Sequence, residues 1–430
     1  MVSDTIEHRA PSGGKQTFLQ HYGATVFGQG LTLALGILTG ILSARMLGPA
    51  GRGEYAAVIV WPMGIAGFFA FGINQAVVFH IGQRTFSSSQ TATAVTVIGI
   101  LQSALSIAVG LVVVPMALAK YSATVQHLGI VFVLLTPAMI FSGYPASLFQ
   151  GTQDFARFNL IRVLAPLTYA LLLIGMFVTH HFNLEMVIDS QLGGYIVALA
   201  IGSVMAWRLL DLRMEWRSEV IPRLVHYGAR TQALSVTYFF NQRIDQLLLS
   251  LLVPPRQLGL YAVAVTLSTS VSIFPQAAGI VAFSKGSAQH AESAKHTIGR
   301  AFQSSFIWLL ISCSVLYWLA PLAIQWVFGE TFGGSVTACR VLLPGAFAAG
   351  LSLVLYNAAS ALGRPGLASY AEGAGVFVTA AGLYELVPRF GFIGAAIVSS
   401  AAYITSLLVM LVLARRVLGI ELRRLFSGAL

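Results

Sequence analysis

Long apolar stretches, separated by short polar breaks, run along nearly the whole chain. Each is close to the roughly 20 residues that a helix needs to cross the hydrocarbon core of a bilayer. The stretches are too long and too uniformly apolar to be the alternating strands of a membrane barrel. We therefore predict an all-α integral membrane protein. About twelve transmembrane helices are expected, at residues 22–46, 55–82, 91–118, 128–150, 159–181, 187–209, 228–253, 258–284, 298–328, 334–362, 366–388 and 391–414.

Three short motifs recur with nearly the same separation, 205 to 209 positions. They are His21–Ala24 with His226–Ala229, Gly53–Ala56 with Gly259–Ala262 and, more loosely, Ser190 and Tyr195 with Ser399 and Tyr403. A shared separation favours a chain built of two homologous halves. In membrane proteins such duplication is typical of transporters, whose substrate site lies between the repeats.

The densest polar stretch, Arg208–His226, separates the sixth predicted helix from the seventh. It carries charges of both signs, and Pro222 breaks it. We expect a first six-helix lobe at 1–209, a cytoplasmic connector at 210–226 and a second six-helix lobe at 227–430. An even number of helices in each lobe gives both lobes the same orientation, related by an axis along the membrane normal.

The composition fits a membrane protein and leaves little room for an enzyme. Hydrophobic residues make up 57% of the chain and charged residues 9%, with a mean hydropathy of +0.79; a soluble domain carries about 25% charged residues. The sequence shows no glycine-rich phosphate loop and no large outer loop. Cys313 and Cys339 fall within predicted helices and indicate neither a disulfide nor a metal site. We expect no enzymatic activity and no cofactor.

The net charge of +10 is explained by membrane topology. With the N-terminus in the cytoplasm, five basic residues fall outside and four within spans, and the other sixteen lie inside. The outer five are Arg45, Arg52, Lys120, Arg256 and Arg389, and those in spans are Arg162, Arg230, Arg243 and Arg340. This asymmetry predicts that both termini are cytoplasmic. It indicates contact with anionic membrane lipids and argues against nucleic acid as a partner.

The seventh predicted helix is richest in residues that a substrate could contact. A charge within a span costs at least about 2.5–3.5 kcal/mol, so it usually faces a cavity or a partner. Tyr238, Asn241 and Asp245 share one face of this helix. Arg243 lies about 200° around the helix from Asp245, so one of the two can line a central cavity while the other meets a neighbouring helix. The alternative is that inter-helix bonds neutralise both.

Four further polar residues are candidates, each with a structural alternative. Arg230 could contact an anionic substrate or extend to lipid headgroups. Arg340 could bind an anion or face a loop, and Asn74 could bind sugar hydroxyls or a neighbouring helix. Glu372, together with Asp245, is a candidate site for coupling to a proton or cation.

Three regions resemble the polysaccharide transporters, which are O-antigen-type flippases of lipid-linked oligosaccharides. Arg45–Ala57 resembles the loop after their first helix. Arg243–Leu249 followed by Leu258–Ala264 resembles their seventh helix and the loop after it. Val327–Phe332 with Leu342–Gly345 resembles their junction of the ninth and tenth helices.

The resemblance implies the fold of the multidrug/oligosaccharidyl-lipid/polysaccharide (MOP) exporter superfamily, a V-shaped pair of six-helix lobes that work by alternating access. It implies a polyprenyl diphosphate-linked oligosaccharide as substrate, moved from the cytoplasmic to the outer leaflet for a surface polysaccharide such as O-antigen lipopolysaccharide or exopolysaccharide. It also implies a bacterial inner membrane, with polysaccharide polymerase and export proteins as partners. Cationic cavity residues would hold the diphosphate, and Arg243 and Asp245 match a recurring family pattern.

Two other functions stay open. A multidrug or cation-coupled antiporter of the same superfamily would share the fold, but would favour carboxylates over arginines within the membrane. The spans hold about as many arginines as acidic residues, which favours an anionic substrate only weakly. A membrane enzyme acting on lipid-linked sugars would need a large outer loop.

Overall fold

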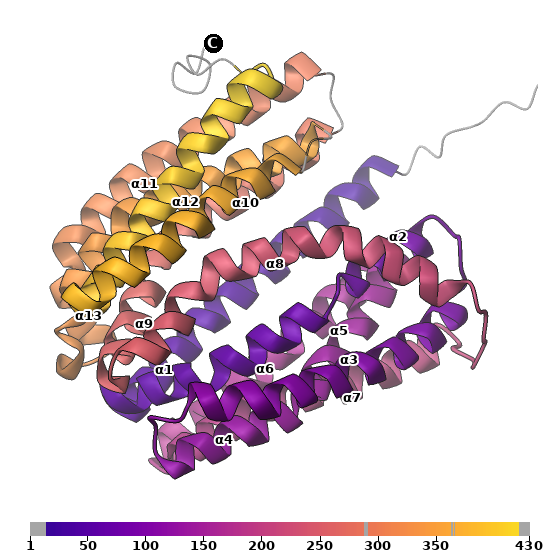
Figure 1. The fold of residues 1–430 in the computed structure, drawn as a ribbon. Helices are drawn as coiled ribbons and strands as arrows, with labels where there is room; N and C mark the ends of the chain where they lie inside the picture. The colour runs from indigo at the N-terminus through magenta and orange to yellow at the C-terminus, as the bar shows by residue number, and fades with distance from the viewer. Residues whose placement is uncertain (1–13, 288–290, 363, 365, 421–430) are drawn as a thin grey trace, which may run out of the picture.

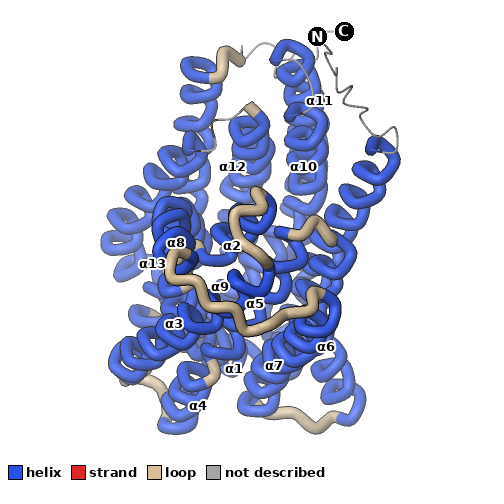
Figure 2. The backbone as a smooth tube through the Cα atoms, turned by 90° about the vertical axis from the view of Figure 1, so that its right-hand side faces the viewer, coloured by secondary structure: helices blue, strands red, loops and turns tan. Residues whose placement is uncertain are grey.

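The computed structural model describes residues 14–287, 291–362, 364 and 366–420. Side chains are described from Phe27 onward, except at 233–241, 280–281, 283–287 and 291–295. Nearly all of this part of the chain is helical and none of it is a strand, as Figure 2 shows. The all-α prediction is confirmed.

The helices follow one another with short connections. In the first half they are α1 (Gly14–Phe69), α2 (Ile73–Gly82), α3 (Ser88–Ala117), α4 (Ala123–Leu134), α5 (Thr136–Gly151), α6 (Phe155–Thr179) and α7 (Leu184–Leu209). In the second half they are α8 (Val220–Leu252), α9 (Pro255–Thr269), α10 (Ile273–Ser287), α11 (Ala291–Val327), α12 (Ser335–Ala361) and α13 (Gly366–Val417). Short 3-10 helices at Ser270–Ser272 and Glu330–Phe332 join α9 to α10 and precede α12.

Two glycines turn the chain inside what are otherwise single long helices. Gly48 in α1 has φ 67° and Gly391 in α13 has φ 57°, a left-handed conformation that glycine adopts without strain. In the described chain, nine helical segments are long and apolar enough to cross a membrane. The two segments that contain these glycines, Phe27–Phe69 and Gly366–Val417, each provide two spans. Counted in this way the nine segments give eleven spans, and α8, with 33 residues, supplies the predicted twelfth.

The helices gather in two groups that meet at one end and diverge from it (Figure 1). One hydrophobic core takes residues from 66 to 224, and a second takes residues from 271 to 420. A third core contains residues of both halves, including Tyr55 and Tyr261. The two halves therefore pack on each other at this third core. We call this region, with the adjoining residues Lys120, Val253 and Val327, the joined end.

Hydrogen bonds also connect the halves at the joined end. Nζ of Lys120 donates to the carbonyl oxygen of Val253 at 2.9 Å. Nε of Arg45 donates to the carbonyl oxygen of Val327 at 2.7 Å. Both basic residues come from the set predicted to lie on the outer side, so the joined end corresponds to the predicted outer end of the molecule.

The backbones of α1 and α9 touch at the repeated motif. A Cβ atom added at Gly53 would lie 1.7 Å from the carbonyl oxygen of Pro255, and one added at Gly259 would lie 1.8 Å from the carbonyl oxygen of Pro49. Both distances are far below van der Waals contact, which is about 3.3 Å for carbon and oxygen. Only glycine fits at the first position of each copy of the motif in this arrangement.

Helix α8 connects the two groups. It packs against α1, α2 and α3 of the first half and against α13 of the second. The predicted connector at 210–226 comprises the loop before α8 and the first turns of that helix. The division of the chain into lobes 1–209 and 227–430 stays a prediction.

Candidate functional site

A cavity of about 320 Å³ lies where the two halves meet. Helices α1, α6 and α7 form its wall on one side, and α8 and α9 contribute from the other. Its polar lining consists of Thr39, Ser43, Arg52, Tyr55, Tyr169, Gln191, Tyr195, Arg243 and Thr266. Because residues of both halves line it, the cavity must change shape when the halves move.

Arg52 enters the cavity from the helix that restarts after Gly48. Pro49 suits the first turn of that helix because its φ is already helical. The Nε atom of Arg52 is buried and has no hydrogen-bond partner among the described residues. Its guanidinium carbon lies 4.9 Å from the centre of the Tyr55 ring. A buried donor without a partner costs about 1–3 kcal/mol, so an acceptor for this group would stabilise the site.

Arg243 reaches the same cavity from α8 and is an exposed side chain there. Its Nη1 atom donates to Oε1 of Gln246 at 3.3 Å, a long bond to a neutral partner. Most of its five donors therefore stay available to a ligand. The described lining of the cavity contains two arginines and no carboxylate.

A network of neutral side chains supports the two arginines. Tyr55 donates its hydroxyl proton to Oε1 of Gln191 at 2.7 Å, and Tyr169 donates to the Tyr55 hydroxyl at 2.9 Å. Tyr195 lies within hydrogen-bonding reach of Gln191. Hydroxyl and amide groups of this kind can exchange bonds with sugar hydroxyls, while guanidinium groups bind phosphate oxygens in pairs. The cavity is thus suited to an anionic, hydroxyl-rich ligand.

Asp245 points away from the cavity, into the second half. Its Oδ2 atom accepts a 2.5 Å hydrogen bond from the hydroxyl of Tyr261, and its Oδ1 accepts from the backbone N–H of Gln246 at 2.7 Å. The Tyr261 hydroxyl also lies 3.0 Å from Oγ of Ser399. Arg243 and Asp245 therefore diverge as the helical geometry predicts, with the arginine on the cavity and the carboxylate against α9 and α13.

Several predicted site residues lie elsewhere. Oδ1 of Asn74 accepts a 3.0 Å bond from Ser147 within the first half. Nε of Arg340 donates to the carbonyl oxygen of Tyr317 at 3.0 Å. Both are thus engaged with neighbouring helices, and neither lines the cavity.

The remaining predicted residues also lie outside the described lining. Glu372 is buried between α12 and α13 beside Tyr356. Arg230 is an exposed residue of α8 outside the lining of the cavity. Tyr238 and Asn241 belong to α8, but their side chains fall outside the described residues.

The sequence matches a known family over most of its length. Residues 18–283 match the model of the family described as polysaccharide biosynthesis protein. The chain belongs to this family. No curated protein matches the sequence.

Several solved structures superpose on the fold of this chain. A lipid II flippase, MurJ, in an inward closed conformation superposes with a TM-score of 0.77 at 15% identity, covering 92% of this chain and 87% of that one. An inward-facing multidrug resistance MATE transporter of the MOP superfamily gives 0.69 at 15% identity, covering 90% and 94%. A MOP superfamily transporter from Pyrococcus furiosus gives 0.57 at 14% identity, covering 94% and 96%. The chain has the fold of this transporter superfamily.

The sequence pattern of this polysaccharide biosynthesis protein does not identify much of the cavity lining. Arg52 was counted among residues outside the membrane, and Tyr55, Tyr169, Gln191 and Tyr195 were not considered as site residues. The signal was present in the duplication, because Tyr55 and Tyr195 both belong to recurring motifs. Repeated polar residues at a lobe interface are candidates for a site between repeats.

The duplicated tyrosines allow a matched test of the buried Asp245. Tyr261→Phe is expected to lower the thermal unfolding midpoint in detergent more than Tyr55→Phe does. The first change removes a donor from a buried carboxylate, which costs about 1.5–3 kcal/mol, and also the bond with Ser399. The second removes two bonds between neutral groups, to Gln191 and from Tyr169, each worth about 1 kcal/mol. Equal midpoints for the two variants would show that Asp245 does not depend on Tyr261.

Proposed function

We propose that this protein is a flippase that moves a polyprenyl diphosphate-linked oligosaccharide from the cytoplasmic to the outer leaflet. The observation that carries the proposal is the cavity between the halves, where Arg52 and Arg243 face a space whose described lining has no carboxylate. A diphosphate cannot cross hydrocarbon unaided, and two guanidinium groups can replace its hydration shell.

The size of the cavity fits part of such a substrate. A volume of about 320 Å³ is at the lower end of ligand pockets, which run from about 300 to 1,000 Å³. It suits a diphosphate and its first sugar, with the hydroxyls of Tyr55, Tyr169 and Tyr195 as sugar partners. The polyprenyl chain stays in the bilayer, and the rest of the glycan lies between the diverging halves.

The proposed direction rests on charge and on the joined end. The excess of Lys and Arg on the side of both termini favours a cytoplasmic location for that side, in a bacterial inner membrane. The halves are closed at the opposite end, so the conformation is one that loads from the cytoplasm. The solved structures described above, one inward closed and one inward-facing, share the fold of this chain.

A multidrug or cation-coupled antiporter is the nearest rival, and the placement of the carboxylates disfavours it. A cationic drug would favour a carboxylate in the cavity, but Asp245 is bonded to Tyr261 and Glu372 is buried away from the cavity. These two carboxylates fit better as sites for proton or cation coupling. A surface polysaccharide such as O-antigen or exopolysaccharide is the end product we favour, with a polymerase and export proteins acting downstream.

The test is transport by the purified protein in phosphatidylcholine vesicles. The substrate is a polyprenyl diphosphate disaccharide with a fluorescent sugar, and an impermeant quencher reports its leaflet. In vesicles that contain the protein, the sugar of the inner leaflet should become accessible to the quencher within minutes. In empty vesicles its fluorescence should stay protected. A polyprenyl monophosphate sugar, which carries less charge, should move more slowly. No difference between protein and empty vesicles, with any lipid-linked sugar tried, contradicts the proposal.

A further inference from the structure

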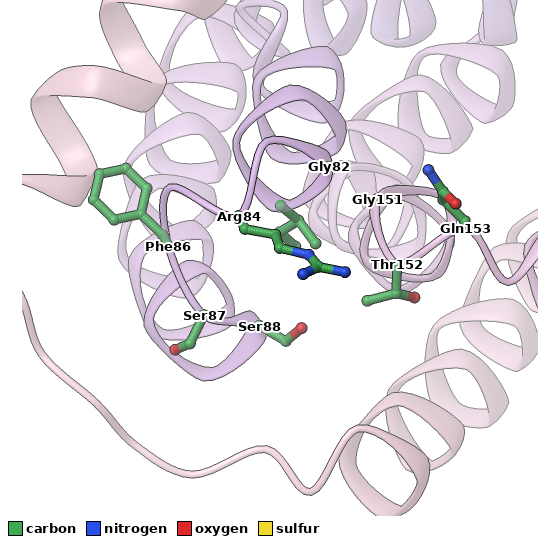
Figure 3. Close-up of a pocket in the computed structure, with 9 residues that line it drawn as sticks. Gly82, Arg84, Phe86, Ser87, Ser88, Gly151, Thr152 and Gln153 are labelled. Carbon is green, nitrogen blue, oxygen red and sulfur yellow. The ribbon is translucent and has the colours of Figure 1, made fainter. Parts of the chain in front are cut away.

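A second cavity lies in the first half, at the end away from the joined end. It measures about 560 Å³ and lies between the turn from α2 to α3 and the turn from α5 to α6. Figure 3 shows the side chain of Arg84 reaching into the gap toward Thr152, with Ser88 nearby. This cavity shares no lining residue with the one between the halves, so it is a separate site.

Arg84 has no carboxylate partner among the described residues, unlike several other arginines at this end. Arg157 is paired with Asp154, and Arg217 is paired with Glu219 at 3.3 Å. An arginine beside a cavity, with no acid to neutralise it, keeps its planar fork of donors for a ligand.

The backbone at Arg84 favours a residue without a side chain. Its φ is 54°, in the left-handed region, as is that of Gln153 on the facing turn at 63°. In both turns a backbone N–H donates a hydrogen bond to the carbonyl oxygen five residues earlier. Thr85 donates to His80 and Asp154 donates to Phe149, at 2.9 Å each. Glycine is the usual residue at this position after a helix. The turn therefore does not need the Arg84 side chain, which points to a use for it in the cavity.

The charges around the cavity leave it positive. Arg217 and Arg223 lie over the ring of Phe86, which lines the cavity, at 5.8 and 5.6 Å. Glu215 lies at its edge, where it accepts a 3.2 Å hydrogen bond from the hydroxyl that caps α3. Glu219 pairs with both Arg217 and Arg223, at 3.3 and 3.6 Å. With Arg84 counted, these three arginines and two carboxylates leave one net positive charge, and Arg84 is the arginine without a carboxylate partner among the described residues.

We propose that this cavity binds a phosphate ester, with Arg84 as the bidentate donor and the hydroxyl of Ser88 as a further partner. The Thr152 hydroxyl already donates to the carbonyl oxygen of Phe149 at 3.1 Å. Helix α3 has 30 residues and is about 45 Å long, more than the roughly 30 Å of hydrocarbon, so its ends reach the headgroup layer. The expected source of the phosphate is the headgroup of an anionic phospholipid. A soluble phosphate presents the same chemistry from the aqueous side.

The test compares lipid binding to the full-length protein in phosphatidylcholine nanodiscs. Phosphatidylglycerol is added in increasing mole fraction, and bound lipid is measured by native mass spectrometry. Arg84→Gly is expected to weaken phosphatidylglycerol binding about tenfold, because one bidentate charged contact is lost. Its thermal unfolding midpoint should be unchanged or higher, because glycine relieves the left-handed backbone. Arg84→Lys keeps the charge but loses the bidentate guanidinium, so its affinity for phosphatidylglycerol should fall between those of the wild type and Arg84→Gly.

Gln153→Gly is the matched control, since it relieves the same strain on the facing turn and leaves the cation in place. It should bind phosphatidylglycerol as the wild type does. Inorganic phosphate and pyrophosphate, titrated into nanodiscs of phosphatidylcholine alone, distinguish the sources. Arg84-dependent binding in that arm identifies a soluble phosphate, and its absence identifies the lipid headgroup. Equal phosphatidylglycerol affinity for Arg84→Gly and Gln153→Gly, whether retained or reduced, overturns the proposal.

Discussion

Replacing Arg52 by methionine is expected to stop transport of a diphosphate-linked sugar without unfolding the protein. A charged hydrogen bond to a phosphate is worth about 1.5–3 kcal/mol, so losing Arg52 should cost about tenfold to a hundredfold in the initial rate at low substrate concentration. Loss of both Arg52 and Arg243 should cost a hundredfold or more. Because Nε of Arg52 is buried and lacks a partner among the described residues, an apolar side chain of similar length should leave the unfolding midpoint unchanged or raise it.

Arg340→Met is the matched control, because it removes an intramembrane arginine that lies outside the cavity. Arg340 donates to the carbonyl oxygen of Tyr317 and packs over that ring at 5.0 Å, so its loss should lower the unfolding midpoint while transport continues. Rates come from the vesicle assay and midpoints from thermal unfolding in detergent. The opposite pattern, in which Arg340→Met stops transport and Arg52→Met only destabilises the protein, would place the substrate elsewhere.

The fold could be predicted from the sequence because the bilayer imposes a length on every apolar segment. Twelve spans follow from that length, and the predicted breaks fall near Gly48 and Gly391, where the helical conformation is interrupted. The turns occur there because Gly48 and Gly391 adopt left-handed conformations. Helix α8 was predicted at 228–253 from its apolar length, whereas in the structure it begins at Val220.

The site was harder to predict, since sequence spacing says which residues share a helix but not how two lobes meet. The divergence of Arg243 and Asp245 follows from the geometry of a single helix, which sequence spacing does describe. The cavity position of Arg52 depends on where α1 resumes after Gly48, which apolar length does not fix. Asn74 and Arg340 form hydrogen bonds with neighbouring helices. No pattern within their own helices distinguishes this role from ligand binding.

Alanine at Gly53 is expected to hold the joined end open. In the present conformation its Cβ would lie 1.7 Å from the carbonyl oxygen of Pro255, so α1 and α9 would have to separate by roughly 1.5 Å to restore normal contact. The carbonyl oxygen belongs to the backbone and the Cβ position is fixed by the backbone, so neither atom can rotate away as the end of a long side chain could. Packed interfaces of this kind are bistable, so the halves should move to an arrangement that opens the joined end. Gly259→Ala should have the same effect, because its Cβ would meet Pro49 in the same way.

The opening can be measured as a distance between spin labels on either side of the joined end. Ala123 at the start of α4 and Arg256 in α9 are exposed and belong to different halves, and each can be changed to cysteine after Cys313 and Cys339 are replaced by alanine. The distance distribution should shift to longer values in Gly53→Ala, and transport should fall at least tenfold because the loading conformation is depleted. Gly30→Ala is the control, since a Cβ atom added there meets nothing within 4 Å. An unchanged distance in Gly53→Ala with full transport would mean that the repeated glycines are not the contact that closes this end. A longer distance in Gly53→Ala and Gly259→Ala alone would show that the two halves close on each other at the duplicated motif. That motif was also the first sign of two halves in the sequence.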